Sequence, residues 1–256
     1  MLKPLQLILI ISAMACVTVF AQKSVGANEG EDDTDSATKD NPAMAPIVDI
    51  PGLPRVLIIG DSISIGYTLQ VRELLKGKAN VHRVPQNCGA TNKGFARTKE
   101  KSTWGLDQPW DVIHYNFGIW DTKIRPNTGK VTTSDEAYIK NLTAITERLK
   151  ETGAELIFAT TTPIPDNLLV AAAPDAKLPQ KSRVFLDVTE KNQLAVKSLS
   201  PMGVQINDLY TVVYPQREAC WRPQDLHFNP HGCDVLAEAV ATSISDALDK
   251  RQNSQP

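Results

Sequence analysis

The sequence predicts an α/β protein, a three-layer α/β/α sandwich around a mostly parallel sheet of five strands. Short runs of branched apolar residues alternate with segments of helical periodicity, the pattern that a doubly wound parallel sheet requires. Several apolar runs end abruptly in small and polar residues, which is typical of the C-terminal edge of such a sheet. Right-handed crossovers between parallel strands then place helices on both faces.

Strands are expected at 55–59, 80–84, 111–117, 155–161 and 203–207, with helices at about 68–76, 135–152, 182–199 and 231–250. The clearest helix follows Ser134, which can cap its N-terminus, and Gly153 can end it. Apolar side chains recur on one face of this helix, at Ile139, Leu142, Ile145 and Leu149.

The N-terminal region divides into two segments that precede the domain. Residues 1–21 carry one early lysine and then an apolar stretch that ends in small residues, as in a secretory signal peptide. A retained N-terminal anchor is the alternative. Residues 22–50 hold seven acidic residues and few large apolar ones, which predicts a disordered acidic tether. We therefore expect one domain at 51–252 in an exported protein, periplasmic or extracellular, without stable membrane insertion after signal removal.

Charge argues against nucleic acid as a partner. The whole chain has a formal net charge of -2, and no basic stripe or patch of basic and aromatic residues occurs in it. The sequence leaves the oligomeric state open.

The residues that follow the first predicted strand suggest a nucleophile. The apolar run at 56–59 stops at Gly60-Asp61-Ser62, so Ser62 would lie at the C-terminal edge of the sheet, where ligands bind in open α/β folds. Taken alone, the tripeptide is equally compatible with an ordinary turn. Near the other end of the chain, Asp225 and His227 precede the last predicted helix and could supply a general base.

Taken together, these segments resemble the SGNH, or GDSL-type, hydrolase family of esterases and lipases. The matching blocks are Gly60-Asp61-Ser62, Gly89, residues 118–121 and His227, and they extend over roughly residues 54 to 250. The resemblance implies a flavodoxin-like strand order, Ser62 as nucleophile and His227 as base. It also implies the backbone N–H groups of Ser62 and Gly89 as oxyanion donors, and neither a metal nor an organic cofactor.

Two positions depart from the family pattern. Trp120 stands where the family usually has an asparagine that donates to the oxyanion; its indole, Asn116 or Asn92 could replace that donor, or only two donors exist. The acidic partner of the histidine usually lies three residues before it, where this chain has Gln224. Asp225, one residue later, could orient the imidazole, a backbone carbonyl could do so, or Asp225 could merely cap a turn.

Asp121 and the tryptophans each admit a structural and a functional interpretation. Asp121 either braces its loop through backbone hydrogen bonds, which we favour, or contacts substrate. Tryptophan side chains near the candidate loops could stack against a sugar ring or serve as packing residues, namely Trp104, Trp110 and Trp221.

The cysteines fit an exported protein. Cys220 and Cys233 flank the His227 loop, and a disulfide between them would close a short loop worth about 3 kcal/mol by a chain-entropy estimate. Two buried free thiols are the alternative. Cys88 remains unpaired, and no pair of histidines or cysteines has the spacing of metal ligands.

The first hypothesis from the sequence is an exported serine ester hydrolase that removes acetyl or short acyl groups from carbohydrate esters. Its substrate would be a small-molecule or polysaccharide ester, and it would need no cofactor. The second is a carbohydrate-binding or surface-assembly protein on the same scaffold, with catalysis weakened at Trp120. An acyltransferase that uses the same serine is the third.

Overall fold

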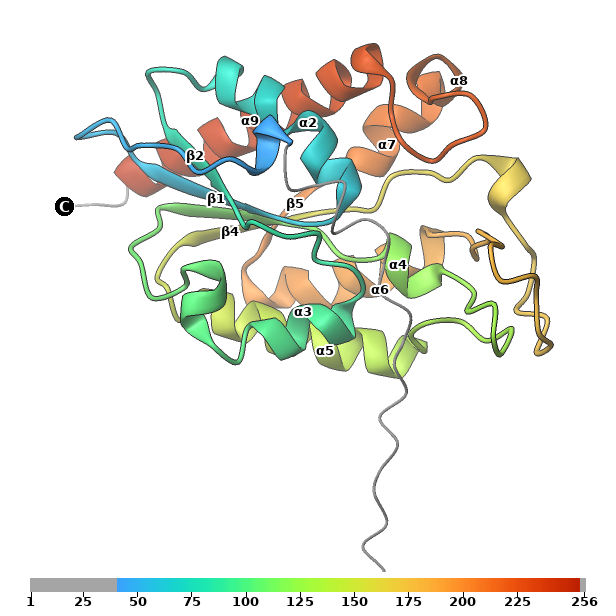
Figure 1. Cartoon of the computed structure of the whole chain (residues 1–256). Coiled ribbons are helices and arrows are strands. Elements are labelled where there is room, and N and C mark those ends of the chain that lie inside the picture. Colours follow the sequence, from blue (N-terminus) through green and yellow to red (C-terminus); the bar gives the residue numbers. More distant parts are fainter. Residues whose placement is uncertain (1–40, 254–256) are drawn as a thin grey trace, which may run out of the picture. The chain divides into compact units, whose positions relative to one another are not determined.

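The structure is a computed structural model, and it describes residues 41–253. The expected signal peptide and the first nineteen residues of the expected tether lie outside the described residues. Five parallel strands form one sheet in the order β2-β1-β3-β4-β5 (Figure 1). Their bounds are Arg55–Ile59 for β1, Asn80–Arg83 for β2, Val112–Tyr115 for β3, Glu155–Ala159 for β4 and Gln205–Asn207 for β5. The predicted α/β class and strand number are confirmed.

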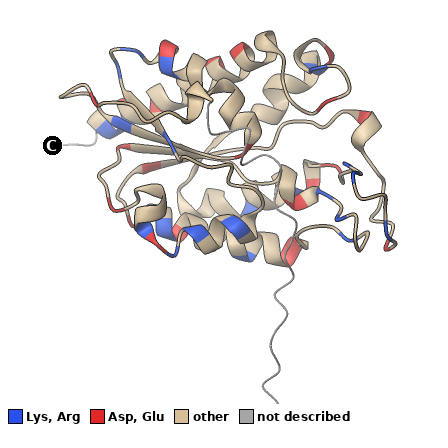
Figure 2. Ribbon diagram, in the orientation of Figure 1, with Lys and Arg blue, Asp and Glu red and all other residues tan. Residues whose placement is uncertain are grey.

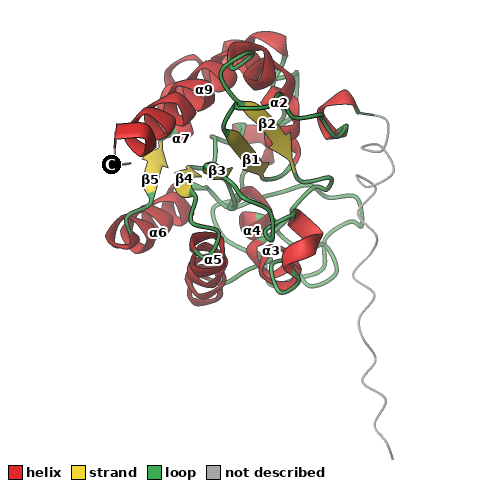
Figure 3. Cartoon of the chain, turned by 90° about the vertical axis from the view of Figure 1, so that its left-hand side faces the viewer, coloured by secondary structure: helices red, strands yellow, loops and turns green. Residues whose placement is uncertain are grey.

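Helices cover both faces of this sheet (Figures 1 and 3). The α-helices are α2 (Ser62–Leu74), α3 (Thr91–Arg97), α4 (Ile119–Thr122), α5 (Asp135–Lys150), α6 (Thr189–Leu199), α7 (Leu209–Val213), α8 (Arg217–Cys220) and α9 (Pro230–Asn253). Helices α2, α7 and α9 lie on one face, and α3, α5 and α6 lie on the other. Short 3-10 turns complete the described chain at Pro42–Met44, Lys101–Trp104, Asp166–Leu168, Ser200–Met202 and Tyr214–Gln216.

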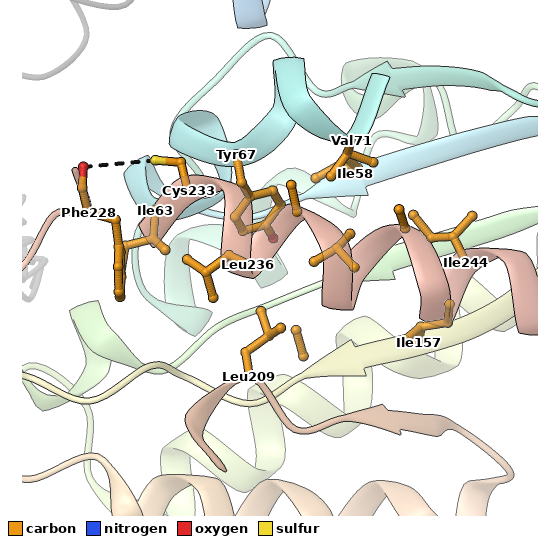
Figure 4. Packing of buried hydrophobic residues seen from close by; sticks show 14 of the residues in the cluster. Ile58, Ile63, Tyr67, Val71, Ile157, Leu209, Phe228, Cys233, Leu236 and Ile244 are labelled. Carbon is orange, nitrogen blue, oxygen red and sulfur yellow. Dashed lines mark hydrogen bonds between the residues drawn. The ribbon is translucent and has the colours of Figure 1, made fainter. Parts of the chain in front are cut away.

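Alternate residues of β1 supply two separate cores, because successive side chains of a strand point to opposite faces. Val56 and Ile58 pack in the cluster beneath α2 and α9, which Figure 4 shows from close by. Leu57 and Ile59 pack in the cluster beneath α5 and α6. The strand is therefore buried on both faces, which explains its continuous apolar run.

Charged residues lie mainly in the helices and loops, with both signs interspersed along the chain (Figure 2). No described helix is long and apolar enough to cross a membrane.

Two predicted helices begin elsewhere. Helix α2 begins at Ser62 rather than near 68, because the Asp61 carboxylate accepts a hydrogen bond from the Ile63 N–H and so caps the helix at the end of the turn. Helix α6 begins at Thr189 rather than near 182. The preceding residues form an irregular segment in which Phe185 bridges to Lys123 and Leu186 donates a backbone hydrogen bond to Thr122. Tertiary pairing has overridden local helical preference there.

The segment 41–50, which the sequence assigns to the tether, is packed against the domain. Ala43 is 1% exposed, and the Arg72 guanidinium donates hydrogen bonds to the carbonyls of Pro42 and Ala45. The Ile50 N–H donates to the Asn80 side chain. The compact part of the chain therefore includes residues 41–50, held by polar contacts that apolar content does not reveal.

Candidate active site

The end of β1 and the start of α2 place Ser62 at the C-terminal edge of the sheet. Asp61 is the N-cap of α2, so Ser62 is its first helical residue. A side chain at Gly60 would place its Cβ 2.7 Å from the Ser64 Oγ, which explains why the turn needs glycine. Ser62 itself is half-buried. The tight turn thus presents the hydroxyl at the rim of the sheet.

The loop before α9 brings a histidine to this hydroxyl. The Arg222 N–H donates to the His227 carbonyl at 2.8 Å, and Trp221 and Phe228 form an antiparallel bridge at the base of the loop. The His227 Nε2 lies 2.9 Å from the Ser62 Oγ, although the two residues are 165 positions apart in the chain. This distance is that of a hydrogen bond between a hydroxyl donor and an imidazole acceptor.

Asp225 holds the other side of the imidazole. The His227 Nδ1 lies 2.9 Å from one carboxylate oxygen of Asp225 and 3.0 Å from the other. A carboxylate only accepts hydrogen bonds, so Nδ1 carries the proton and Nε2 is left free to accept from Ser62. Gln224, at the position the family usually gives to the acid, has a φ of 56° within the loop turn.

Neighbouring groups favour the ionised form of Asp225. Partial burial raises its pKa, but the hydrogen bond from His227 and the charges of His227 and Arg183 together hold the pKa below its ordinary value. The Arg183 Nη1 lies 3.9 Å from a carboxylate oxygen of Asp225. Asp225 is therefore ionised at neutral pH.

The arrangement of Ser62, His227 and Asp225 is that of a nucleophile, a base and a group that orients the base. A serine hydroxyl becomes an effective nucleophile when a neighbouring imidazole can take its proton. A carboxylate on the far nitrogen fixes the imidazole tautomer and stabilises the cation that forms. The three side chains can therefore support acyl transfer through the serine oxygen.

The expected oxyanion donors are mostly engaged elsewhere. The Gly89 N–H donates to the Asn87 Oδ1 at 3.1 Å, and the Asn116 amide donates to the Ala159 carbonyl at 2.7 Å. Trp120 packs partly against the core beneath α9, with the Lys123 Nζ 4.5 Å from its ring centroid. The Ser62 N–H, at the first position of α2, has no helical carbonyl to pair with. Ser62 is thus the best-placed backbone donor.

Asp121 braces two loops. It is fully buried, and its carboxylate accepts hydrogen bonds from the Thr91 N–H at 3.1 Å and the Thr91 hydroxyl at 2.6 Å. Burial raises the pKa of Asp121 to about 6, although the hydrogen bonds from Thr91 oppose the shift. These contacts support the bracing interpretation, because they join the start of α3 to α4.

Two of the three candidate tryptophans are packing residues. Trp104 and Trp110 are 2% and 5% exposed, and their indole N–H groups donate to Gln86 and Gly105. Trp221 is half-buried within the His227 loop. Trp221 is therefore the one tryptophan of the three that is left as a candidate for substrate contact.

Two other histidines have partners elsewhere in the structure. His114 is fully buried, with its Nε2 3.2 Å from the Asn207 amide, and burial lowers its pKa to about 3. His82 pairs with Asp49 at 2.6 Å. The His227 Nε2, by contrast, lies within hydrogen-bond distance of the Ser62 Oγ.

The expected disulfide between Cys220 and Cys233 is not formed. Both are buried free cysteines, as is Cys88. The Cys233 thiol points to the Phe228 carbonyl, with the sulfur and oxygen 3.9 Å apart (Figure 4), and packs beside Gly66 of α2. The loop between α8 and α9 is held instead by backbone hydrogen bonds, such as that from the Asn229 N–H to the Cys220 carbonyl.

Sequence reasoning did not identify two arginines near the site. Arg183 reaches Asp225 from the long segment between β4 and α6, and Arg83 donates hydrogen bonds to the carbonyls of Gly60 and Asp61. A charged residue in a short edge strand gives no sequence signal of that contact. Within residues 41–253, no three acidic, histidine or cysteine side chains are grouped so that they could hold a metal ion.

The comparison with protein families agrees with this geometry. Residues 122–256, more than half of the chain, match the family model described as SGNH hydrolase-like domain, acetyltransferase AlgX. The matched region includes Asp225 and His227 and begins after Ser62. The chain therefore belongs to this SGNH hydrolase-like family.

Solved structures share the fold. A lipase/acylhydrolase from Enterococcus faecalis superposes with a TM-score of 0.58 at 19% identity, over 76% of this chain and 96% of that one. A GDSL-like lipase from Bacteroides thetaiotaomicron gives 0.53 at 15% identity, over 80% and 95%. The psychrotrophic esterase EstA from Pseudoalteromonas sp. gives 0.53 at 12% identity, over 76% and 98%. No curated protein sequence matches the chain significantly. At these identities the likeness shows the fold alone.

Proposed function

We propose that the protein is an exported serine ester hydrolase that removes acetyl or short acyl groups from carbohydrate esters. The observation that carries the proposal is the continuous hydrogen-bonded chain from the Ser62 Oγ through His227 to Asp225. Membership of an SGNH hydrolase-like family supports acyl chemistry as the class of reaction.

In the proposed reaction, the Ser62 Oγ attacks the ester carbonyl carbon while the His227 Nε2 takes the hydroxyl proton. The tetrahedral intermediate collapses, the ester C–O bond breaks, and the imidazolium gives its proton to the departing alcohol oxygen. A water molecule then attacks the acyl-enzyme, with His227 as base, and the carboxylic acid leaves as the proton returns to Ser62. Asp225 keeps Nδ1 protonated throughout.

The oxyanion that forms in both steps must be met by donors already aimed at it. The Ser62 N–H is one such donor. With the Gly89 N–H and the Asn116 amide engaged in the resting protein, we expect modest turnover, since loss of one oxyanion donor costs about 10²- to 10³-fold in rate.

A second candidate, an acyltransferase, follows from the family description, which names an acetyltransferase. The chemistry up to the acyl-enzyme is the same. The two activities differ in the second acceptor, which is water for a hydrolase and a sugar hydroxyl for a transferase.

A carbohydrate-binding protein without turnover is the third candidate. The engagement of the expected oxyanion donors and the presence of Trp120 favour it over a fully efficient enzyme.

Hydrolysis of p-nitrophenyl acetate by the wild-type protein, compared with Ser62→Ala, tests the proposal. Ser245→Ala is the control, because this serine lies on α9 and its hydroxyl is bonded to the Ala241 carbonyl. We expect turnover in the wild type and in Ser245→Ala, and only background in Ser62→Ala. Equal background rates in all three proteins would favour the binding function. Acylated product in the presence of methyl glucoside, formed in preference to acetate, would favour the transferase.

A further inference from the structure

A buried arginine lies directly behind the nucleophile turn. Arg83, the last residue of β2, is 7% exposed. Its Nη2 donates to the Gly60 carbonyl at 3.0 Å and to the Asp61 carbonyl at 3.1 Å. Its Nε lies 3.3 Å from the Met44 sulfur, and its Nη1 is buried with no partner among the described residues. A buried cation with an unsatisfied N–H is costly, so its presence calls for an explanation.

Peptide geometry links this contact to the site. The Asp61 carbonyl and the Ser62 N–H belong to one peptide unit, which is planar and trans, so the two groups point in opposite directions. Arg83 binds the carbonyl side. The Ser62 N–H is consequently aimed away from Arg83.

The same carbonyl accepts two further hydrogen bonds. The Ser64 hydroxyl donates to the Asp61 oxygen at 2.7 Å, and the Ile65 N–H donates at 3.1 Å. Of the three donors, Arg83 alone carries a charge, and a guanidinium in a protein does not lose its proton. Hydrogen bonds polarise one another in a low-dielectric interior, so a cation on the carbonyl makes the N–H of the same peptide unit a stronger donor.

Arg83 also links the turn at Gly60 to the loop that carries Gly89. The Gly60 carbonyl that accepts from Arg83 also accepts from the Cys88 N–H at 3.2 Å. One nitrogen of Arg83 therefore fixes the two successive carbonyls that precede Ser62, and the first of them is shared with the loop that carries Gly89.

We propose that Arg83 is a positioning residue for acyl chemistry at Ser62, which orients and polarises the Ser62 N–H as an oxyanion donor. The inference rests on the proposed role of Ser62 as nucleophile.

Arg72 provides a matched control. Like Arg83 it holds the segment 41–50, through hydrogen bonds to the Pro42 and Ala45 carbonyls, and it also binds the Val81 carbonyl of β2. These hydrogen bonds end on the three carbonyls and not on the turn at Gly60 and Asp61. Loss of Arg72 should therefore reduce thermal stability and leave the oxyanion donor unchanged.

The test compares kcat, KM and Tm for p-nitrophenyl acetate in the wild type, Arg83→Gln, Arg83→Lys and Arg72→Gln. A weakened oxyanion donor acts on the transition state, so we expect Arg83→Gln to lower kcat by about 10- to 100-fold with little change in KM. Arg83→Lys, which keeps the charge but lacks the guanidinium geometry, should show a smaller loss of kcat. Arg72→Gln should lower Tm and retain kcat.

A folded Arg83→Gln protein with the kcat of the wild type would overturn the inference. The proposed function would still stand in that case, provided that turnover by the wild type depends on Ser62. If Arg83→Gln does not fold, Arg83→Lys decides: wild-type kcat in that variant overturns the inference, and reduced kcat with unchanged KM supports it. Equal losses of kcat in Arg83→Gln and Arg72→Gln would also overturn it, since both would then reflect general destabilisation. Absence of Ser62-dependent turnover in the wild type would remove the proposed function and this inference together.

Discussion

Replacement of Asp225 by asparagine isolates the contribution of the carboxylate to the activation of His227. Both oxygens of Asp225 lie within 3.0 Å of the His227 Nδ1, so the substitution removes a charge-assisted hydrogen bond without removing side-chain volume. Hydrogen bonds to charged groups contribute about 1.5–3 kcal/mol. Each 1.36 kcal/mol corresponds to a factor of ten in rate. We therefore expect kcat/KM to fall by about 10- to 100-fold.

The expected loss is smaller than at a deeply buried acid, because the Asp225 side chain is 29% exposed and water can partly replace its charge. The assay is hydrolysis of p-nitrophenyl acetate at neutral pH, with Asp107→Asn, on an exposed turn, as control. Wild-type kcat/KM in Asp225→Asn would refute the role of the carboxylate and leave a serine–histidine dyad.

Three further predictions concern stability and the thiols. Burial raises the pKa of Asp121 from 3.8 to about 6, so the folded state binds a proton more tightly than the unfolded state. The contribution of Asp121 to the free energy of unfolding should therefore fall by about 3 kcal/mol as pH rises from about 4 to 6. Urea unfolding should show that Asp121→Asn lacks this fall, and a pH dependence equal to that of the wild type would contradict the assignment. Gly94→Ala should lower the free energy of unfolding by about 1–3 kcal/mol, because the new Cβ would lie 2.6 Å from the Phe117 ring. Thermal unfolding measures this effect, and an unchanged Tm would show that α3 can shift to make room. Thiol labelling of denatured, non-reduced protein should find all three cysteines of the described region reactive, and a shortfall of two would restore the disulfide.

The sheet could be predicted from sequence because its strands are buried on both faces. The run at 55–59 is apolar apart from its first residue, and β1 has those bounds. Helix α5 is equally predictable from the sequence, since the Ser134 hydroxyl caps it and one of its faces is apolar. Helix α3 gave no such signal: it is seven residues long, and Gly94 lies within it because the Phe117 ring packs against that position.

The contacts that complete the candidate site are less predictable from the sequence. The approach of His227 to Ser62 could be expected, since both follow from a known pattern of blocks. The hydrogen bond between Gly89 and Asn87 could not, because it depends on a loop conformation with a φ of 63° at Gly89. The burial of Arg83 likewise depends on how residues 41–50 fold back on the edge strand.

The central claim is that His227 activates Ser62 as a nucleophile. Mass measurement of the intact protein and of its proteolytic peptides after exposure to diethyl p-nitrophenyl phosphate tests this claim most directly, since an activated serine is phosphorylated irrespective of its natural ester. We predict a single adduct on Ser62 in the wild type and none, over the same time, in His227→Gln. An unlabelled wild type, an adduct on another residue, or equal labelling of Ser62 in His227→Gln would contradict the claim.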